Sequence, residues 1–116
     1  MDAYDVVMCG KIEGDKDFVE KFAKAYAQIR QSVLKRTGRL PKVWNPALLS
    51  LECPDREYAW YLQKCYDAIF ASPKATVVLL ADWAESKGAR AEHATAMALR
   101  MDVAGVEEIV GSGEKF

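Results

Sequence analysis

The segment 76–80, Thr-Val-Val-Leu-Leu, constrains the fold of this chain more than any other part of its sequence. Five successive apolar or β-branched residues predict a strand that is buried on both faces, as at the centre of a parallel sheet. Such a sheet must be covered by helices on both sides, and helical patterns precede and follow this segment. The sequence therefore predicts an α/β fold.

Strand-like and helical segments alternate along the rest of the chain. Strands are predicted over residues 4–9, 42–44 and 76–80, helices over 15–38, 57–71 and 89–100, a loop or single helical turn over 47–56, and an edge strand or turn over 103–110. This order predicts right-handed crossovers. We expect a small flavodoxin- or Rossmann-like three-layer fold, with a sheet of four to five mainly parallel strands. A single domain is expected over 1–116, with a flexible tail over 111–116.

Apolar side chains form a stripe along each of the first two predicted helices. In the first helix the stripe consists of Phe18, Phe22, Tyr26, Ile29 and Val33. In the second helix it consists of Tyr58, Leu62, Cys65 and Ile69. Spacings of three and four residues indicate helix faces that pack on the sheet. Asp15 is predicted to cap the first helix and Gly38 to end it.

Charge and composition argue against several classes of protein. Sixteen basic and seventeen acidic side chains give a net charge of -1, so no nucleic acid polymer is expected as a partner. No apolar segment is long enough to span a bilayer, and the N-terminus is acidic where a secretory signal is basic. We therefore expect a cytoplasmic protein without a membrane partner. The three cysteines form no Cys-x-x-Cys pair and His93 is the only histidine, so no metal site is expected.

The segment 86–92, Ser-Lys-Gly-Ala-Arg-Ala-Glu, is the most informative candidate for a ligand site. In parallel α/β sheets ligands bind beyond the carboxyl ends of the strands, so the loops that begin at Gly10, Asn45 and Asp82 are the expected places. Ser86 and the following glycine precede free helix N–H groups, which suit an anion such as phosphate. Glu92 follows about one turn into the helix. The alternative is that Ser86 is an ordinary N-cap and Glu92 a solvated helix residue.

Four short motifs carry a family resemblance. They are Cys-Gly-Lys-Ile-Glu-Gly over 9–14, Asn45-Pro46, the helical segment from Trp60 to Asp67, and Trp-x-x-Ser-x-Gly-Ala-x-x-Glu over 83–92. Together they resemble the nucleoside 2-deoxyribosyltransferase-like superfamily, especially its small phage and bacterial members of unknown function. The resemblance covers residues 4 to about 103, and the last motif is the most specific.

The resemblance implies a chemistry for these residues. In the characterised enzymes a helix glutamate attacks the anomeric carbon of a (deoxy)ribonucleoside or its 5′-monophosphate, and the base leaves. By resemblance Glu92 is the nucleophile, and Asp67 orients the sugar hydroxyl or the nucleophile. Ser86 and Gly88 belong to the loop that holds the 5′-phosphate, and Gly10 packs against the ligand. The resemblance implies no cofactor, and it implies a homo-oligomer (a dimer or higher) in which a neighbouring subunit completes the site.

Departures from the family pattern leave alternatives open. Lys11 replaces a usual proline and either contacts phosphate or is exposed, and Ala75 stands where an aspartate often opens the central strand. Asp82 replaces a common glycine and either binds a ribose hydroxyl or repels a phosphate. Trp83 either stacks on a base or packs in the core. The substrate-binding residues expected from the sequence are Gly10, Lys11, Asn45, Asp82, Trp83, Ser86 and Gly88.

Two functions are therefore expected from the sequence. The first is N-glycosidic bond cleavage, or deoxyribosyl transfer, on a nucleoside or nucleoside 5′-monophosphate. The alternative is a non-catalytic protein that binds a nucleotide signal, such as a phage would encode to sequester a host defence signal. A third option is a structural or interaction protein on a reused fold, because fold alone does not fix function.

Overall fold

Four parallel strands form the centre of the computed structural model, which describes residues 3–111. They are β1 (Val6–Cys9), β2 (Val43–Trp44), β3 (Thr76–Leu79) and β4 (Asp102–Gly105). Their order in the sheet is β2-β1-β3-β4, and every neighbouring pair is parallel. The prediction of a sheet with four to five mainly parallel strands is confirmed.

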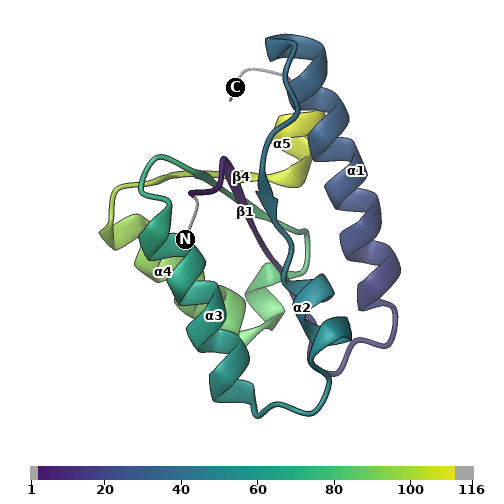
Figure 1. The fold of residues 1–116 in the computed structure, drawn as a ribbon, viewed down its shortest axis with the longest axis vertical. Helices are drawn as coiled ribbons and strands as arrows, with labels where there is room; N and C mark the ends of the chain where they lie inside the picture. The colour runs from purple at the N-terminus through teal and green to yellow at the C-terminus, as the bar shows by residue number, and fades with distance from the viewer. Residues whose placement is uncertain (1–2, 112–116) are drawn as a thin grey trace.

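Helices cover both faces of this sheet and give the three layers visible in Figure 1. They are α1 (Phe18–Thr37), α2 (Pro46–Glu52), α3 (Tyr58–Ala71), the short 3-10 helix η1 (Trp83–Glu85), α4 (Lys87–Ala98) and α5 (Val106–Gly111). Helices α1 and α5 lie together on one side of the sheet, and α3 and α4 lie together on the other. The predicted three-layer α/β fold is therefore confirmed.

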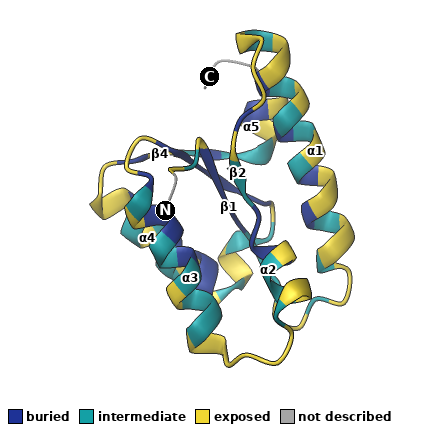
Figure 2. Cartoon of the chain, viewed as in Figure 1, coloured by how far each residue is buried: buried dark blue, intermediate teal, exposed yellow. Residues whose placement is uncertain are grey.

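The side chains of β1 alternate between the two faces of the sheet, and each face has its own core. Val6 and Met8 belong to the cluster formed with α1 and α5, whereas Val7 and Cys9 belong to the cluster formed with α3 and α4. All four residues are buried, and Figure 2 shows β1 as a dark blue strand between the helical layers. Burial on both faces is what a central parallel strand requires.

The apolar stripe predicted for the first helix faces the sheet. Phe22 and Ile29 of α1 are fully buried, and Phe18 and Tyr26 pack at the margin of the same core. Gly38 ends the helix in the left-handed conformation, with φ at 75°. Glycine is favoured there because it has no Cβ atom to clash with the preceding turn.

The prediction that Asp15 caps α1 is wrong. The helix begins at Phe18 with Asp17 at the N-cap position, and the Asp17 side chain makes no capping hydrogen bond. The carboxylate of Asp15 instead accepts hydrogen bonds from the backbone N–H of Asp17 (2.9 Å) and from the ammonium of Lys21 (2.5 Å). The Asp15 carboxylate is therefore engaged by the residue just before the helix and by a side chain of its first turn.

Residues 46–52, predicted within a loop or single helical turn, form the helix α2. The side chain of Asn45 accepts a hydrogen bond from the backbone N–H of Ala47 (3.1 Å), and Pro46 occupies the start of the helix. Proline is favoured there because its φ is already helical and its missing N–H needs no acceptor. The Asn-Pro pair therefore begins a helix as well as ending a strand.

The segment after α4 contains both a strand and a helix. The predicted edge strand is confirmed as β4, but the sequence analysis did not predict α5. The backbone N–H of Gly105 donates to the carboxylate of Glu108 (3.0 Å), a local contact that helps to turn the chain into α5. Of the tail predicted to be flexible, residues 112–116 lie outside the described residues. No helix between residues 3 and 111 has the length and apolar character needed to cross a membrane.

Candidate functional site

A cavity of about 870 Å³ lies where β1 and β3 end. Its wall combines the loop after β1, the N-terminal part of α4, and parts of α2 and α3. Strands β1 and β3 are neighbours, and the chain continues from β1 to β2 on one side and from β3 to β4 on the other. Open α/β sheets bind ligands at such a switch point, and the volume is typical of a small-molecule site.

Glu92 of α4 supplies a buried carboxylate to this cavity. Only 6 % of the residue is exposed, and its Oε2 atom has no hydrogen-bond partner among the described residues. Burial raises the pKa of Glu92 to about 7, although a hydrogen bond with the Cys65 thiol opposes the rise. Such a carboxylate changes its charge near neutral pH, and perturbed groups of this kind are concentrated at functional sites.

The N-terminus of α4 supplies hydrogen-bond donors to the same cavity. The helix begins at Lys87, two residues before its predicted start, because the Ser86 hydroxyl caps it by accepting from the N–H of Ala89 (3.1 Å). The N–H groups of Lys87 and Gly88 have no acceptor within the helix at these positions and favour an anion. Ser86 is thus an N-cap whose own hydroxyl proton is left to donate to a ligand.

Tyr58 of α3 reaches the first turn of α4. A Cβ atom placed on Gly88 would lie 2.6 Å from the Tyr58 hydroxyl oxygen, closer than any real contact of that kind. Burial, followed by the charges of Glu13 and Glu92, raises the pKa of Tyr58, so its hydroxyl stays protonated and can donate. Glycine at position 88 is therefore what allows Tyr58 to approach the helix N-terminus.

The part of the lining contributed by α2, α3 and their connection is mainly apolar. It includes Pro46, Leu49, Pro54, Tyr61 and Leu62. The Tyr61 hydroxyl donates to the carbonyl of Cys53, so it holds the connection between α2 and α3 in place. Apolar and aromatic walls beside a few polar donors are the usual composition of a site for a small organic ligand.

The charged side chains of the lining suit a ligand with an anionic part and a neutral part. Lys11 and Lys87 are its cations, and Glu13 and Glu85 are carboxylates beside the buried Glu92. Within residues 3–111, no group of three or more His, Cys, Asp or Glu side chains is placed to hold a metal ion.

The structure brings together the predicted site residues that follow β1 and begin α4. Gly10, Lys11, Ser86, Gly88 and Glu92 all line the cavity. Gly10 also permits close packing behind the wall, because a Cβ atom there would meet side-chain atoms of Leu80 and Phe22 at 3.0 Å. This glycine is therefore required by the core as well as by the cavity.

Four predicted site residues do not line the cavity: Asn45, Asp67, Trp83 and Asp82, the last of which lies beside it. Asn45 caps α2, as described above. Trp83 packs against the ring of His93, with the ring centroids 4.5 Å apart, which agrees with the packing alternative for this tryptophan. Asp67 accepts a hydrogen bond from Gln63 (2.9 Å) on the solvent-exposed part of α3. The structure therefore does not bring Asp67 to Glu92.

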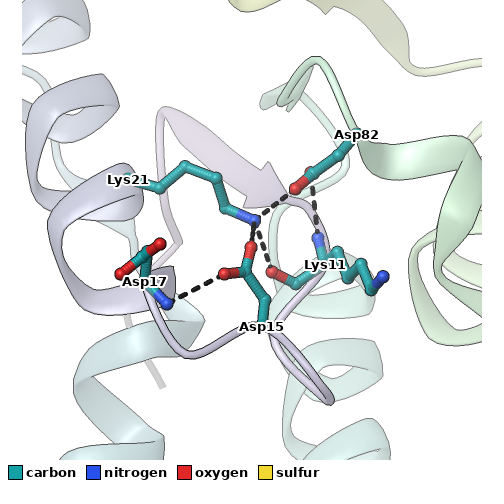
Figure 3. A network of polar contacts seen from close by, with 5 residues as sticks. All are labelled: Lys11, Asp15, Asp17, Lys21 and Asp82. Atoms are coloured by element: carbon teal, nitrogen blue, oxygen red, sulfur yellow. Dashed lines mark hydrogen bonds and ion pairs between the residues drawn. The ribbon is translucent and has the colours of Figure 1, made fainter.

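Asp82 is engaged in a polar network beside the cavity. Its carboxylate accepts hydrogen bonds from the backbone N–H of Lys11 (3.2 Å) and from the ammonium of Lys21. Figure 3 shows both contacts. Two alternatives were expected for Asp82: it binds a ribose hydroxyl or it repels a phosphate. Both need a carboxylate without protein partners, whereas the Asp82 carboxylate is paired with Lys21 and with the N–H of Lys11.

The cavity residues of α3 were not expected from the sequence. Tyr58, Leu62 and Cys65 belong to the stripe predicted to pack on the sheet, and its last member, Ile69, does so. The first three line the cavity instead. Periodicity identifies the inward face of a helix, but it does not reveal whether that face meets side chains or open space.

Comparison with known proteins gives one family. A family model described as Domain of unknown function (DUF4406) matches residues 4–105, which include every lining residue of the cavity. Neither a curated protein nor a solved structure matches the chain.

Proposed function

The chain belongs to the DUF4406 family, and we propose that it cleaves the N-glycosidic bond of a nucleoside or nucleoside 5′-monophosphate with Glu92 as nucleophile. Hydrolysis and transfer of the sugar to a second base are two outcomes of the same chemistry. The proposal extends the resemblance to the nucleoside 2-deoxyribosyltransferase-like superfamily. It is supported by the cavity's own residues.

The observation that carries the proposal is the buried, unpartnered Oε2 of Glu92, a residue in the lining of a ligand-sized cavity. A buried carboxylate with one oxygen unpartnered is unfavourable when ionised, and proteins retain such groups where their charge is used. Departure of a base leaves positive charge on the sugar, which an adjacent carboxylate stabilises strongly in a dry site. An ionised Glu92 therefore interacts better with the transition state than with the neutral substrate.

The reaction balances without a metal or cofactor. An oxygen of Glu92 forms a bond to the anomeric carbon, and the bond from that carbon to the base nitrogen breaks. The electron pair leaves with the base, which takes up a proton. Water then attacks the anomeric carbon, releases the glutamate and loses a proton, so that one water is consumed in each cycle. In transfer, the nitrogen of a second base replaces the water.

The N-terminus of α4 supports a monophosphate as the preferred substrate. Ser86 and the free N–H groups of Lys87 and Gly88 suit phosphate oxygens, and Lys11 adds a cation to the same cavity. Asp82 is the carboxylate that the sequence suggested would repel a phosphate, and its ion pair with Lys21 compensates its charge. We therefore infer that the phosphate lies on α4, with the sugar over Glu92.

The experiment incubates the protein with ribo- and deoxyribonucleosides and their 5′-monophosphates, and follows free base by chromatography. We expect base release from at least one substrate. Glu92→Gln, which keeps the shape of the side chain, should lower the rate at least ~1,000-fold while the protein stays folded. Glu20→Gln, on the exposed part of α1, is the matched control and should leave the rate unchanged. Base release that survives in Glu92→Gln contradicts the proposal.

The second candidate function is nucleotide binding without turnover. It is favoured by the position of Asp67, which does not line the cavity and therefore cannot assist Glu92 there. A protonated Glu92 would then donate a hydrogen bond to the ligand. This alternative predicts a rise in melting temperature that grows with ligand concentration, with the ligand recovered intact.

A further inference from the structure

Lys21 of α1 joins two loops beside the cavity, the loop after β1 and the loop after β3. Its ammonium donates to the carbonyl oxygen of Lys11 (2.7 Å) and to the carboxylate of Asp15 (2.5 Å) in the loop after β1. It also donates to the carboxylate of Asp82 in the loop after β3. Figure 3 shows these acceptors gathered around one nitrogen atom. An ammonium has three protons, so the contacts use its full donor capacity.

The network fixes the backbone of Lys11 on both sides. Its N–H donates to Asp82 (3.2 Å), and its carbonyl accepts from Lys21. Figure 3 shows the Lys11 side chain extending away from this cluster, and Lys11 lines the cavity. The direction of that side chain therefore depends on contacts made outside the cavity.

Lys21 also forms ion pairs with two carboxylates beside this part of the wall and partly compensates their charge. Its side chain is 26 % exposed, and those of Asp15 and Asp82 are 22 % and 21 % exposed. Partial burial opposes the charge of Lys21, but its hydrogen bonds to the carboxylates of Asp15 and Asp82 outweigh this effect, and the pKa of Lys21 is raised. Without Lys21, the two carboxylates would repel an anion in the neighbouring cavity.

We propose that Lys21 is a positioning residue that sets the preference of the cavity for a phosphorylated ligand. This inference rests on the proposed function. Lys21 does not line the cavity; it acts through the backbone of Lys11 and through the charges of Asp15 and Asp82. Its removal frees the loop after β1 and exposes the ligand to uncompensated negative charge. Binding of the phosphate is weakened because the phosphate carries the charge of the ligand. The reaction at Glu92 is unchanged.

The test compares Lys21→Met with Lys24→Met, which removes the same charge from an exposed position of α1. With the best monophosphate, we expect Lys21→Met to raise KM about tenfold and to change kcat less than twofold. With the corresponding nucleoside, KM should rise less than threefold. Lys21→Arg, which keeps the charge, should restore most of the affinity. Equal KM values for Lys21→Met and Lys24→Met would overturn the proposal. So would an equal rise in KM for the nucleoside and the monophosphate in Lys21→Met.

A second measurement needs no ligand and remains informative if the variant is less stable. Amide hydrogen exchange, followed by mass spectrometry well below the melting temperature, should accelerate over residues 10–16 and 81–86 in Lys21→Met but not in Lys24→Met. Unchanged exchange in both loops would overturn the positioning role. If the wild-type protein neither binds nor cleaves any monophosphate, the proposed function fails, while the exchange result still decides whether Lys21 holds the loops.

Discussion

Two carboxylates ten residues apart, Asp82 and Glu92, have opposite surroundings on either side of the start of α4. Asp82 is paired with Lys21 and with a backbone N–H, and it ties two loops together. Glu92 is more deeply buried, and its Oε2 has no partner in the described part of the chain. The paired group lies beside the cavity and the unpaired group lies within its lining.

The difference separates residues that maintain the site from a residue that performs its chemistry. A buried charge that serves only the fold is compensated, because an uncompensated one opposes folding. A carboxylate that must act on a ligand keeps at least one oxygen free of protein partners, and the fold tolerates the cost. Asp82 follows the first rule and Glu92 follows the second, so substitutions at these positions should have opposite effects on stability.

The largest expected effect is a change in the pH dependence of stability when Glu92 is replaced. Its pKa rises from 4.5 to about 7 on folding, so the folded state binds more protons between these values. The wild type therefore loses about 3 kcal/mol of unfolding free energy as the pH rises from 4.5 to above 7. Glu92→Gln should not show this loss, and above pH 8 it should be more stable than the wild type.

Denaturant unfolding at several pH values measures this difference. Asp82→Asn is the informative comparison, because loss of its contact with Lys21 should lower the stability by about 1 kcal/mol at neutral pH. If Glu92→Gln and the wild type have parallel stability curves from pH 4.5 to 8, Glu92 does not titrate as its burial requires.

The second effect concerns the pH dependence of base release. A nucleophilic Glu92 must be ionised, so the rate should fall about tenfold for each pH unit below 7 and be about 100-fold lower at pH 5. A nucleoside without phosphate is the right substrate, since it lacks a phosphate group that titrates in the same range. A rate that increases as the pH falls below 7 would mean that Glu92 acts as a proton donor.

The third effect tests the contact between α3 and α4. Gly88→Ala should weaken binding of the monophosphate about tenfold, because the new Cβ atom displaces the Tyr58 hydroxyl from the helix N-terminus. In a Tyr58→Phe background the same substitution should reduce the affinity little, since the nearest remaining ring atom lies 3.6 Å from the new Cβ atom. Calorimetric titration of the four proteins measures the coupling, and additive losses would argue against the contact.

The smallest effect is expected at Asp67. Asp67→Asn should change the rate of base release less than twofold and the stability by less than about 0.5 kcal/mol, because Asp67 accepts only from Gln63 on the exposed part of α3. Initial rates under the conditions used for Glu92→Gln provide the check. A loss approaching that of Glu92→Gln would mean that Asp67 reaches the substrate, as the family resemblance implies.

Local sequence patterns were enough to predict most of the fold. The apolar segment at 76–80 and the short strands at 4–9 and 42–44 required helices on both faces, and the structure has them. Errors occurred where side-chain hydrogen bonds decide local structure. Asp15 accepts from Lys21 instead of capping α1, and Asn45 begins a helix where a loop was an alternative. Hydrophobic periodicity carries no information about such bonds.

For the site, the amino-acid sequence was enough to predict which loops meet and which carboxylate follows them. Parallel strands place their carboxyl ends together, so Gly10, Ser86 and Glu92 could be expected at one edge of the sheet. Which carboxylate has an unpartnered oxygen follows from the three-dimensional packing. Asp82 and Glu92 are both carboxylates in the sequence, but Lys21, distant in sequence, neutralises the first, and the packing of α3 on α4 buries the second. Charge compensation and burial depend on which residues are neighbours in space, and the pattern of residues along the sequence does not give these neighbours.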